Sequence, residues 1–504
     1  METEIELKLL VSGDLDVVEL LQSQLLPGLQ AQSSCRQMAL SNRYYDTPDK
    51  QLRGMDMGFR VRGRDGRFQQ TLKTAGQIQG GLHQRPEYNV ELSDQYPDLS
   101  LFESSIFPDG VSVAALQSAL VPLFTTHFKR CAIELVFESG TELELVYDKG
   151  QVATASHQQP INEIEIELKK GDVGEIFVLA RQLSELMPLR LGAFSKAARG
   201  YLLAAGQELT PKPLPDFLVL QESDSLEQAF IKAVHYGLDY WQYHEQCYLE
   251  TQKPRALAGI RAGIQLVSQA ISLYLPMLQC DALLELQTRL IQLNNDWYWA
   301  ENLLAIKTLR SRKGPFRKRL AKSEELLSYL RGRYEGLLLQ YQPDNLIQRQ
   351  QSGQLQVDLA ALAFEQPWRA SGNAWSSPVQ EHARGWLAQG WFTISQSMPR
   401  KKRFSAQNYI SSEPLLRQTL FNGLFLAGLF SPEHRDQFRA PWLDIIDGID
   451  ELNALHLLKS ELDVADVQDK DELLIWCKDK MAHLLDVMEQ SRKAALKMEP
   501  YWKP

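Results

Sequence analysis

The sequence predicts an α+β protein in two parts, a β-rich N-terminal half followed by an all-helical C-terminal half. Up to about residue 200, apolar and charged side chains alternate with a period of two, and beyond it apolar residues recur at helical spacing. Between the halves, Pro211, Pro213 and Pro215 make the chain extended and semi-rigid. We therefore expect domains at 1–205 and 221–504, joined by a Pro-rich linker at 206–220.

Composition narrows the class of protein. With 504 residues, of which 44% are hydrophobic, the chain is typical of globular proteins and unlike collagen or a disordered tail. Its net charge of −9 argues against nucleic acid as a partner. The longest clean apolar stretch, 423–430, is far shorter than the roughly 20 residues of a membrane span, so no membrane partner is expected.

The cysteines and the N-terminus predict a cytoplasmic location. Five cysteines are widely spaced, which indicates neither a disulfide framework nor a Cys-x-x-Cys metal site. The chain begins Met1-Glu2-Thr3-Glu4, which is acidic and has no apolar core behind it, unlike a signal or transit peptide.

Seven runs in the N-terminal half show the alternation of a strand with one apolar and one charged face. They lie near 4–9, 59–64, 68–73, 85–92, 130–138, 142–148 and 163–168. Two stretches of helical spacing, near 14–26 and 172–187, interrupt them. The first half is therefore predicted as a sheet with peripheral helices.

The C-terminal half is predicted as helices throughout. Ser225 and Gln228 have the spacing of a capping box and precede an apolar stripe from Leu226 to Trp241. Further helices are predicted near 256–275, 281–308, 322–341, 379–396, 412–429, 436–458 and 470–496. A weak similarity between 290–296 and 445–451 suggests two related helical bundles, although chance competes with it.

The charged strand faces admit two interpretations. One charged face is most simply the solvated outside of a sheet, but surface ion pairs contribute only ~0–1 kcal/mol each and do not explain seven such faces. In the second, the strands close into a barrel with the charged faces inside and the apolar faces under helices. Because unpaired buried charges cost several kcal/mol each, that interior must hold water, metal ions and a charged ligand.

The charged residues indicate what such a ligand is. Guanidinium and ammonium groups match phosphate oxygens. Carboxylates cannot bind phosphate directly but suit Mg²⁺ or Mn²⁺, which bridge to phosphate. The candidate cations are Lys8, Arg60, Arg62, Arg64, Lys73, Arg85 and Arg130, and the candidate acids are Glu4, Glu6, Glu87, Glu165 and Glu167. Together they predict a site for a metal ion and an oligophosphate.

The first strand carries a recognisable motif. Glu4-Ile5-Glu6-Leu7-Lys8 resembles the Glu-x-Glu-x-Lys signature of the CYTH superfamily, the triphosphate tunnel metalloenzymes. Further matches follow in order at Tyr44-Tyr45-Asp46-Thr47-Pro48, Arg60-x-Arg62, Leu72-Lys73, Arg85-x-Glu87, Arg130, Asp148, Glu165-x-Glu167 and Ser195-Lys196. The set resembles bacterial inorganic triphosphatases, in which a CYTH domain precedes a helical CHAD domain.

The resemblance implies an eight-stranded antiparallel tunnel that hydrolyses a triphosphate with Mg²⁺ or Mn²⁺, most simply inorganic tripolyphosphate to phosphate and diphosphate. The implied substrate-binding residues are Lys8, Arg60, Arg62, Lys73, Arg85, Arg130 and Lys196. The implied metal ligands are Glu4, Glu6, Glu165 and Glu167, with Glu87, Asp148 and Glu163 in support and Glu163 at the tunnel mouth. Catalysis would rest on Glu4, Glu6, Lys8, Lys73 and Arg130, and no general base is assigned.

Alternatives remain open at this point. A thiamine or nucleoside triphosphatase, or a class IV-type adenylate cyclase, would share the tunnel. A non-catalytic polyphosphate-binding or scaffold protein would bind its ligand without hydrolysing it. Phe128 departs from the family, which often has Lys there. In the helical half, polyphosphate is the ligand usually associated with CHAD domains. The basic runs 310–313, 317–319 and 400–403 are candidates to bind it, but only Arg261 remains of the usual His-and-Arg pattern.

Overall fold

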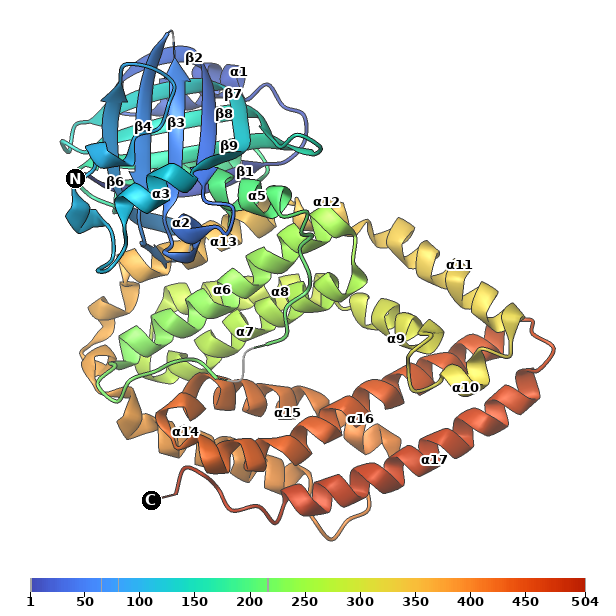
Figure 1. The fold of residues 1–504 in the computed structure, drawn as a ribbon. Helices are drawn as coiled ribbons and strands as arrows, with labels where there is room; N and C mark the ends of the chain where they lie inside the picture. Colours follow the sequence, from blue (N-terminus) through green and yellow to red (C-terminus); the bar gives the residue numbers. More distant parts are fainter. Residues whose placement is uncertain (1, 65, 80, 215–216, 504) are drawn as a thin grey trace. The chain divides into compact units, whose positions relative to one another are not determined.

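The structure is a computed structural model that describes residues 2–64, 66–79, 81–214 and 217–503 (Figure 1). Contacts divide the chain into two compact units. The first comprises Met1–Thr210 and Ile347–Glu365, and the second comprises Pro211–Leu346 and Gln366–Pro504. The chain therefore crosses between the units three times.

Eight antiparallel strands of the first unit close into a barrel, which confirms the predicted tunnel. Its order is β1 (Glu2–Val11), β9 (Gln158–Lys170), β8 (Glu142–Ala153), β7 (Val121–Phe137), β2 (Ala31–Asp46), β3 (Gly58–Arg64), β4 (Arg67–Lys73) and β6 (Leu82–Leu92), with β6 pairing back to β1. Two short strands, β5 (Gln77–Gln79) and β10 (Leu189–Leu191), add to β6 and β1.

The alternation along the strands places apolar side chains in a core outside the barrel. Leu7, Leu9, Ile164 and Ile166 are fully buried, while the charged residues between them point to the other face. The helix α4 (Gly174–Leu186), predicted near 172–187, packs on β9 with a buried apolar face. The charged faces are thereby turned inward.

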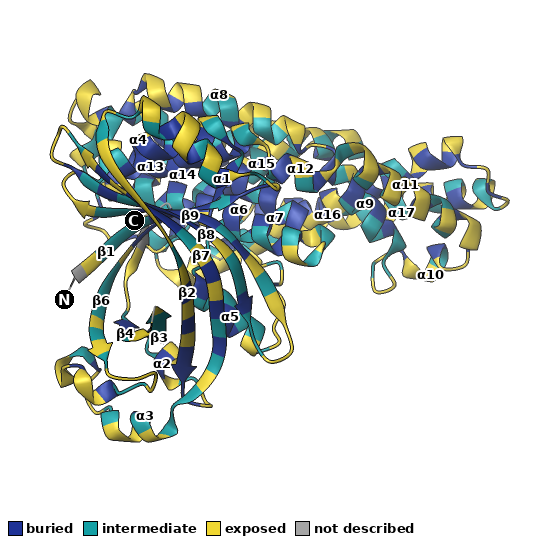
Figure 2. Ribbon diagram, turned by 90° about the horizontal axis from the view of Figure 1, so that it is seen from above, coloured by how far each residue is buried: buried dark blue, intermediate teal, exposed yellow. Residues whose placement is uncertain are grey.

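Strand β2 was not predicted. Its first half is largely exposed, so it lacks the apolar alternation of a half-buried strand, whereas its second half is buried (Figure 2). It pairs with β7 along its whole length, from Ala31 opposite Phe137 to Asp46 opposite Val121. Backbone pairing with a distant strand, rather than a local pattern, makes this segment a strand.

The other elements of the first unit are helical turns around the barrel. The stretch predicted near 14–26 forms α1 (Val17–Leu20), a π turn (Leu21–Leu25) and a 3₁₀ turn (Leu26–Gly28). The short helices α2 (Gln51–Gly54), α3 (Val113–Ala119) and α5 (Lys196–Ala204) were not predicted. The Ser195 side chain caps α5 by accepting a hydrogen bond from the Ala198 N–H, and the helix brings Lys196 to the barrel.

The second unit is all-helical, as predicted. The capping box of Ser225 and Gln228 is present at the start of α6. Predicted helices are found as α6 (Leu226–Thr251), α7 (Pro254–Leu278), α11 (Glu324–Tyr341), α14 (Val379–Ser397), α15 (Ala406–Leu426), α16 (Pro432–Val464) and α17 (Lys470–Ala495). The single helix predicted over 281–308 is wrong: α8 (Asp281–Asp296) and α9 (Ala300–Arg310) are separated at the buried Trp297 and Trp299. The helices α10 (Arg317–Leu320), α12 (Pro343–Ile347) and α13 (Gln350–Glu365) were missed.

The segment predicted as a linker contains neither helix nor strand where it is described, and Pro215 and Asp216 lie outside the described residues. From residue 211 onward it belongs to the second unit. The Lys212 N–H donates to His244 Nε2 at 3.1 Å, and the Leu218 N–H donates to the Leu424 carbonyl at 2.8 Å.

Among the described residues, α7 is the single helix long and apolar enough to cross a membrane. Core helices of globular proteins have the same composition. Here Ile260, Ile264 and Val267 are fully buried inside the second unit.

Candidate functional site

The barrel encloses a cavity of about 270 Å³ whose walls are strongly charged. All the candidate phosphate- and metal-binding residues except Arg64 line it: Glu4, Glu6, Lys8, Arg60, Arg62, Lys73, Arg85, Arg130, Glu165, Glu167 and Lys196, together with Glu87. These side chains come from six strands spread along the chain's first two hundred residues, β1, β3, β4, β6, β7 and β9, and from α5. The closed barrel is what brings them together.

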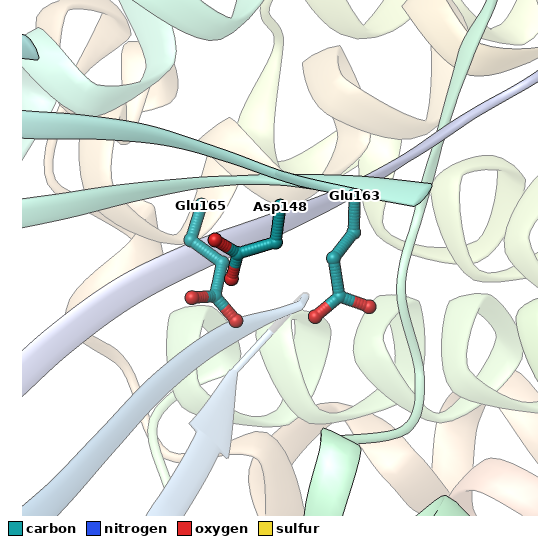
Figure 3. A group of neighbouring side chains, drawn as sticks. All are labelled: Asp148, Glu163 and Glu165. Carbon is teal, nitrogen blue, oxygen red and sulfur yellow. The ribbon is translucent and has the colours of Figure 1, made fainter. Parts of the chain in front are cut away.

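A buried acidic cluster lies at one side of this cavity. Asp148 on β8 and Glu163 and Glu165 on β9 point toward one another (Figure 3). Lys196 Nζ lies 2.7 Å from Asp148, 2.5 Å from Glu163 and 3.0 Å from Glu165. Lys8 contacts both glutamates, Arg130 binds Asp148 and Glu165, and Arg199 Nη1 lies 3.2 Å from Glu163.

The protonation of this cluster follows from its cations. Burial by itself would raise the pKa of each carboxyl. The attraction of Lys196, together with Arg130 at Asp148, Lys8 at Glu163 and both at Glu165, is stronger than this effect and holds all three pKa values below their usual range. Four cations thus surround three carboxylates. The cluster is internally neutralised, and it is a poor place for an additional metal ion.

The wall formed by β3 and its neighbours carries a surplus of positive charge. Burial, followed by the guanidinium groups of Arg60 and Arg130, lowers the pKa of Arg62 to about 9. Arg62 Nε donates to the Asn42 amide oxygen at 2.8 Å instead of to a carboxylate. Because a guanidinium keeps its proton in proteins, the lowered pKa marks a buried cation beside two like charges, which a bound anion would stabilise.

Two further hydrogen-bond donors in the cavity wall are unsatisfied. Among the described residues, the buried Nε atoms of Arg60 and Arg85 have no hydrogen-bond acceptor. Buried donors in proteins are almost always satisfied, so a polar ligand is the expected acceptor. The positive surplus and these donors both fit a compact polyanion.

The wall formed by β1, β9 and β8 carries the opposite surplus. Glu6 lies directly opposite Glu167, which lies directly opposite Glu144. Burial and the neighbouring Glu6 raise the pKa of Glu4 to about 7, although Lys73 opposes this. Burial likewise raises the pKa of Glu167, with Glu144 and Glu6 adding to it, even though Lys169 Nζ lies 2.7 Å away. Like charges placed opposite one another on a sheet are destabilising.

These carboxylates fit a divalent metal ion. Hard cations such as Mg²⁺ and Mn²⁺ take carboxylate oxygens as ligands. A bound cation would stabilise the charged forms of Glu4 and Glu167, whose pKa values burial and then neighbouring carboxylates raise. Of the four predicted ligands, Glu4 and Glu6 lie on β1 and Glu167 lies opposite Glu6 on β9, so these three belong to the acidic wall. Glu165 is already bound by Lys8, Lys196 and Arg130.

Comparison with known proteins agrees with this geometry. The family model of the CYTH domain matches residues 2–201. Residues 2–201 are a CYTH domain. The match covers the barrel, α4 and most of α5, and it therefore contains every residue predicted for the site.

The chain is 35% identical over 213 residues to the inorganic triphosphatase of Haemophilus influenzae, which covers 42% of this chain and 57% of that protein. The chain thus spans little more than half of the length of that curated relative. Two solved structures are also similar. One is a Hippeastrum protein studied as an adenylyl cyclase and described as having a dominant triphosphatase activity. It is 20% identical with a TM-score of 0.30, and the match covers 41% of this chain and 97% of the Hippeastrum chain. The other is the CHAD domain of Ricinus communis, with 15% identity and a TM-score of 0.43. That match covers 56% of this chain and 97% of the Ricinus chain.

Two sequence-based placements change within the CYTH domain, those of Arg64 and Glu163. Arg64 is exposed at the end of β3 and does not line the cavity, because the strand ends there in a turn. Glu163 is fully buried beneath Lys8 and Lys196 and is not at a tunnel mouth. Asp148 is also fully buried, where it supports Arg130.

The structure adds residues that the sequence analysis did not assign to the CYTH site. Glu144 lines the cavity, and its signal was available, since it shares a face of β8 with Asp148 four residues later. Arg199 follows Lys196 by three residues on α5, so the two lie on the same helical face and both reach Glu163. His83 is buried in the cavity wall opposite Glu6.

Phe128, where a lysine is common in relatives, lines the CYTH cavity and contacts two of its cations. Its ring centre lies 5.6 Å from Arg130 Cζ and 5.3 Å from Lys196 Nζ, within the range of cation–π attraction. Tyr44, from the matched Tyr44-Tyr45-Asp46-Thr47-Pro48 segment, also lines the cavity and stacks on Phe124, whereas Tyr45 packs in the core outside it.

The basic runs of the helical unit are partly occupied by acids of the same unit. Arg319 lies 3.3 Å from both Asp469 and Glu472, and Arg403 pairs with Asp486. Arg261 is held by Glu301. Lys318 and Lys401 are exposed.

Proposed function

We propose that this chain hydrolyses inorganic tripolyphosphate to phosphate and diphosphate with a divalent metal ion, Mg²⁺ or Mn²⁺. The observation that carries the proposal is the pairing of two surpluses, of cations and of carboxylates, in one cavity of about 270 Å³. A chelated polyanion is the ligand that balances both. The triphosphatase name of the Haemophilus relative supports the same reaction.

The cations hold the phosphate chain in this proposal. Arg60, Arg62 and Arg85 offer guanidinium donors, which match phosphate oxygens in geometry. Arg130 is held in place by two hydrogen bonds of 2.7 Å to Asp148, and it lines the cavity. Lys8, Lys73 and Lys196 add point charges that neutralise the phosphates, and positioning with charge neutralisation is most of what phosphoryl transfer requires.

The carboxylates Glu4, Glu6 and Glu167 would hold the metal ion, with Glu144 beside them. The ion supplies charge neutralisation on phosphate oxygens and a lowered pKa for a water molecule. One water is consumed, one P–O–P bond breaks, and the products are phosphate and diphosphate. Glu87 keeps Lys73 in position, with its oxygen 3.0 Å from Nζ.

The shape of the cavity favours an inorganic substrate over thiamine or nucleoside triphosphates and over a cyclase reaction. Its volume of about 270 Å³ lies just below the roughly 300–1,000 Å³ of small-molecule sites. The aromatic rings among its described lining residues, Tyr44, His83 and Phe128, are each at most 5% exposed and offer little face for a base to stack on.

The test is a comparison of substrates in one assay. Phosphate release is measured with tripolyphosphate, thiamine triphosphate, ATP and GTP, each with Mg²⁺, Mn²⁺ or a chelator. We expect tripolyphosphate to give the highest kcat/KM and the chelator to abolish release. A higher kcat/KM for ATP or thiamine triphosphate would replace the proposed substrate.

The scaffold alternative requires a binding measurement beside the assay. Tripolyphosphate that binds to the full chain by calorimetry without any release above the chelator blank would make the protein a binding protein. Polyphosphate binding by the helical unit and a cytoplasmic location stay predictions. Retention of the chain on a long-chain polyphosphate column, with the CYTH cavity blocked by tripolyphosphate, would test the former.

A further inference from the structure

Strand β10 has one edge that the barrel does not cover. It pairs with β1 through Leu9 opposite Leu191 and Val11 opposite Leu189, and the Gly192 N–H donates to the Lys8 carbonyl at 2.9 Å. In an antiparallel pair, successive residues present their backbone groups to alternate sides. Leu189 and Leu191 therefore direct backbone groups away from β1.

Helix α13 covers this edge, although it follows the barrel by about 150 residues in the sequence. The Leu191 N–H donates to Gln356 Oε1 at 3.3 Å, and both residues are fully buried. At Gly353, a Cβ atom would lie only 1.7 Å from the Leu189 carbonyl oxygen. Glycine is thus required where the helix meets the strand.

The same helix is held separately on α4. Gln350 Nε2 donates to the carbonyls of Ser184 and Glu185 at 2.8 Å, and Gln354 Nε2 donates to Ser184 at 3.2 Å. Arg181 binds Asp358 at 2.8 Å. These hydrogen bonds join α13 to α4 and not to β10, so the roles of Gln354 and Gln356 can be separated.

The strand edge leads directly to the cavity. Lys8 lines the cavity and is 1% exposed, and its backbone carbonyl accepts a hydrogen bond from the Gly192 N–H. A Cβ atom at Gly192 would lie 2.8 Å from Lys8 Cγ, so β10 is packed against the stem of that lysine. A displacement of β10 is therefore transmitted to the position of Lys8.

We propose that Gln356 is a positioning residue for the tunnel: by satisfying the Leu191 N–H it fixes β10, and through β10 it fixes the Lys8 end of β1. The cavity is complete only when α13 is docked. The kinetic part of this inference rests on the proposed triphosphatase function, whereas its structural part does not.

The test compares Gln356→Met with Gln354→Met in the full chain. Methionine keeps the size of glutamine and removes the hydrogen bond, and the two positions lie on the same helix. Hydrogen–deuterium exchange is measured in peptides covering 2–11 and 189–192, with tripolyphosphate kinetics in Mg²⁺ beside it. For Gln356→Met we expect about tenfold faster exchange in both peptides, as loss of one buried hydrogen bond gives. We expect KM to rise by a similar factor and kcat to change less, because Lys8 binds a phosphate.

Gln354→Met should leave exchange in 2–11 and KM unchanged. Equal effects of the two variants would overturn the inference, because both would then act only by loosening α13 on α4. Unchanged exchange in 2–11 for Gln356→Met would also overturn it. Gly353→Ala provides a second route to the same displacement and should show the same exchange pattern. If the wild-type chain releases no phosphate while the exchange pattern holds, the proposed function fails and the positioning role stands.

Discussion

Arg130 and Asp148 lie directly opposite each other on β7 and β8 and are joined by two hydrogen bonds of 2.7 Å each. Asp148 is fully buried and also binds Lys196 at 2.7 Å. One carboxylate thus orients two cations of the cavity wall. Its removal would leave both cations without their shared partner.

We expect Asp148→Asn to lower the free energy of unfolding of the CYTH domain by roughly 3–5 kcal/mol, the cost of removing one partner of a buried ion pair. Scanning calorimetry of the full chain measures it as a lower transition temperature for the first unit. Glu142→Gln is the matched control on the same strand, since its pair with Lys170 is exposed and should contribute less than about 1 kcal/mol. Equal shifts for the two variants would contradict the expectation.

Replacement of Glu6 by Gln should remove the metal ion without unfolding the barrel. Glu6 lies opposite Glu167, and the amide cannot replace the charge that a divalent ion requires. We expect Mn²⁺ affinity, measured by paramagnetic resonance titration, to fall by at least about 100-fold, with phosphate release falling in parallel. Glu134→Gln, at an exposed position of β7, should change neither. Unaltered Mn²⁺ binding in Glu6→Gln would remove this residue from the proposed metal site.

Metal affinity should increase with pH around neutrality. Burial and Glu6 raise the pKa of Glu4 to about 7, so a proton competes with the metal ion below that pH and is released above it. Between about pH 6 and about pH 8, Mn²⁺ affinity should rise about tenfold, as the ionised fraction of a group with this pKa does. The comparison is with Glu4→Gln, whose weaker binding should not vary with pH over this range. A flat profile for the wild-type chain would show that Glu4 is not a ligand.

The CYTH domain should lose stability in acid. The pKa values of Asp148, Glu163 and Glu165 lie below their usual range in the folded state, so the unfolded state binds more protons as the pH falls. The stability that these groups contribute is fully present above about pH 4.5 and is lost as the pH falls through their folded pKa values. Calorimetry between about pH 6 and about pH 3 measures the slope. Lys196→Met, which removes the cation shared by all three, should flatten it, and an equal slope would argue against this assignment.

A fragment ending at residue 205 should be less stable than the first unit of the full chain. It lacks α13 and so uncovers the apolar face of α4, where Phe177 stacks on Phe364 with ring centres 5.2 Å apart. A synthetic peptide covering 347–365 should raise the fragment's melting temperature when added in trans. A Phe364→Ala peptide should do so less, and a fragment whose melting is insensitive to both peptides would show that the barrel needs no helix there.

Much of the barrel could be predicted from local pattern. Alternation alone placed Glu4, Glu6 and Lys8 on one face of a strand, because successive side chains of a strand point to opposite sides. Strand β2 was missed for the same reason, since its exposed first half carries no alternation. The break between α8 and α9 was missed because buried Trp297 and Trp299 continue the apolar character of the helices on either side.

The sequence by itself determined that the charged residues of each predicted strand share one face, with both signs among the strands, and from this it predicted a chelated polyanion as the ligand. Only the tertiary structure decided which acids are neutralised and which remain available for a metal ion. Glu165 and Glu167 share one face of β9, yet Glu165 is bound by Lys8, Lys196 and Arg130 while Glu167 lies opposite Glu6 and Glu144. The face of a residue follows from backbone periodicity, which is local. Its charge partners come from other strands and helices, which for Glu165 lie between 31 and 157 residues away in the sequence. The docking of α13 on β10 is likewise non-local, and no local pattern contains either.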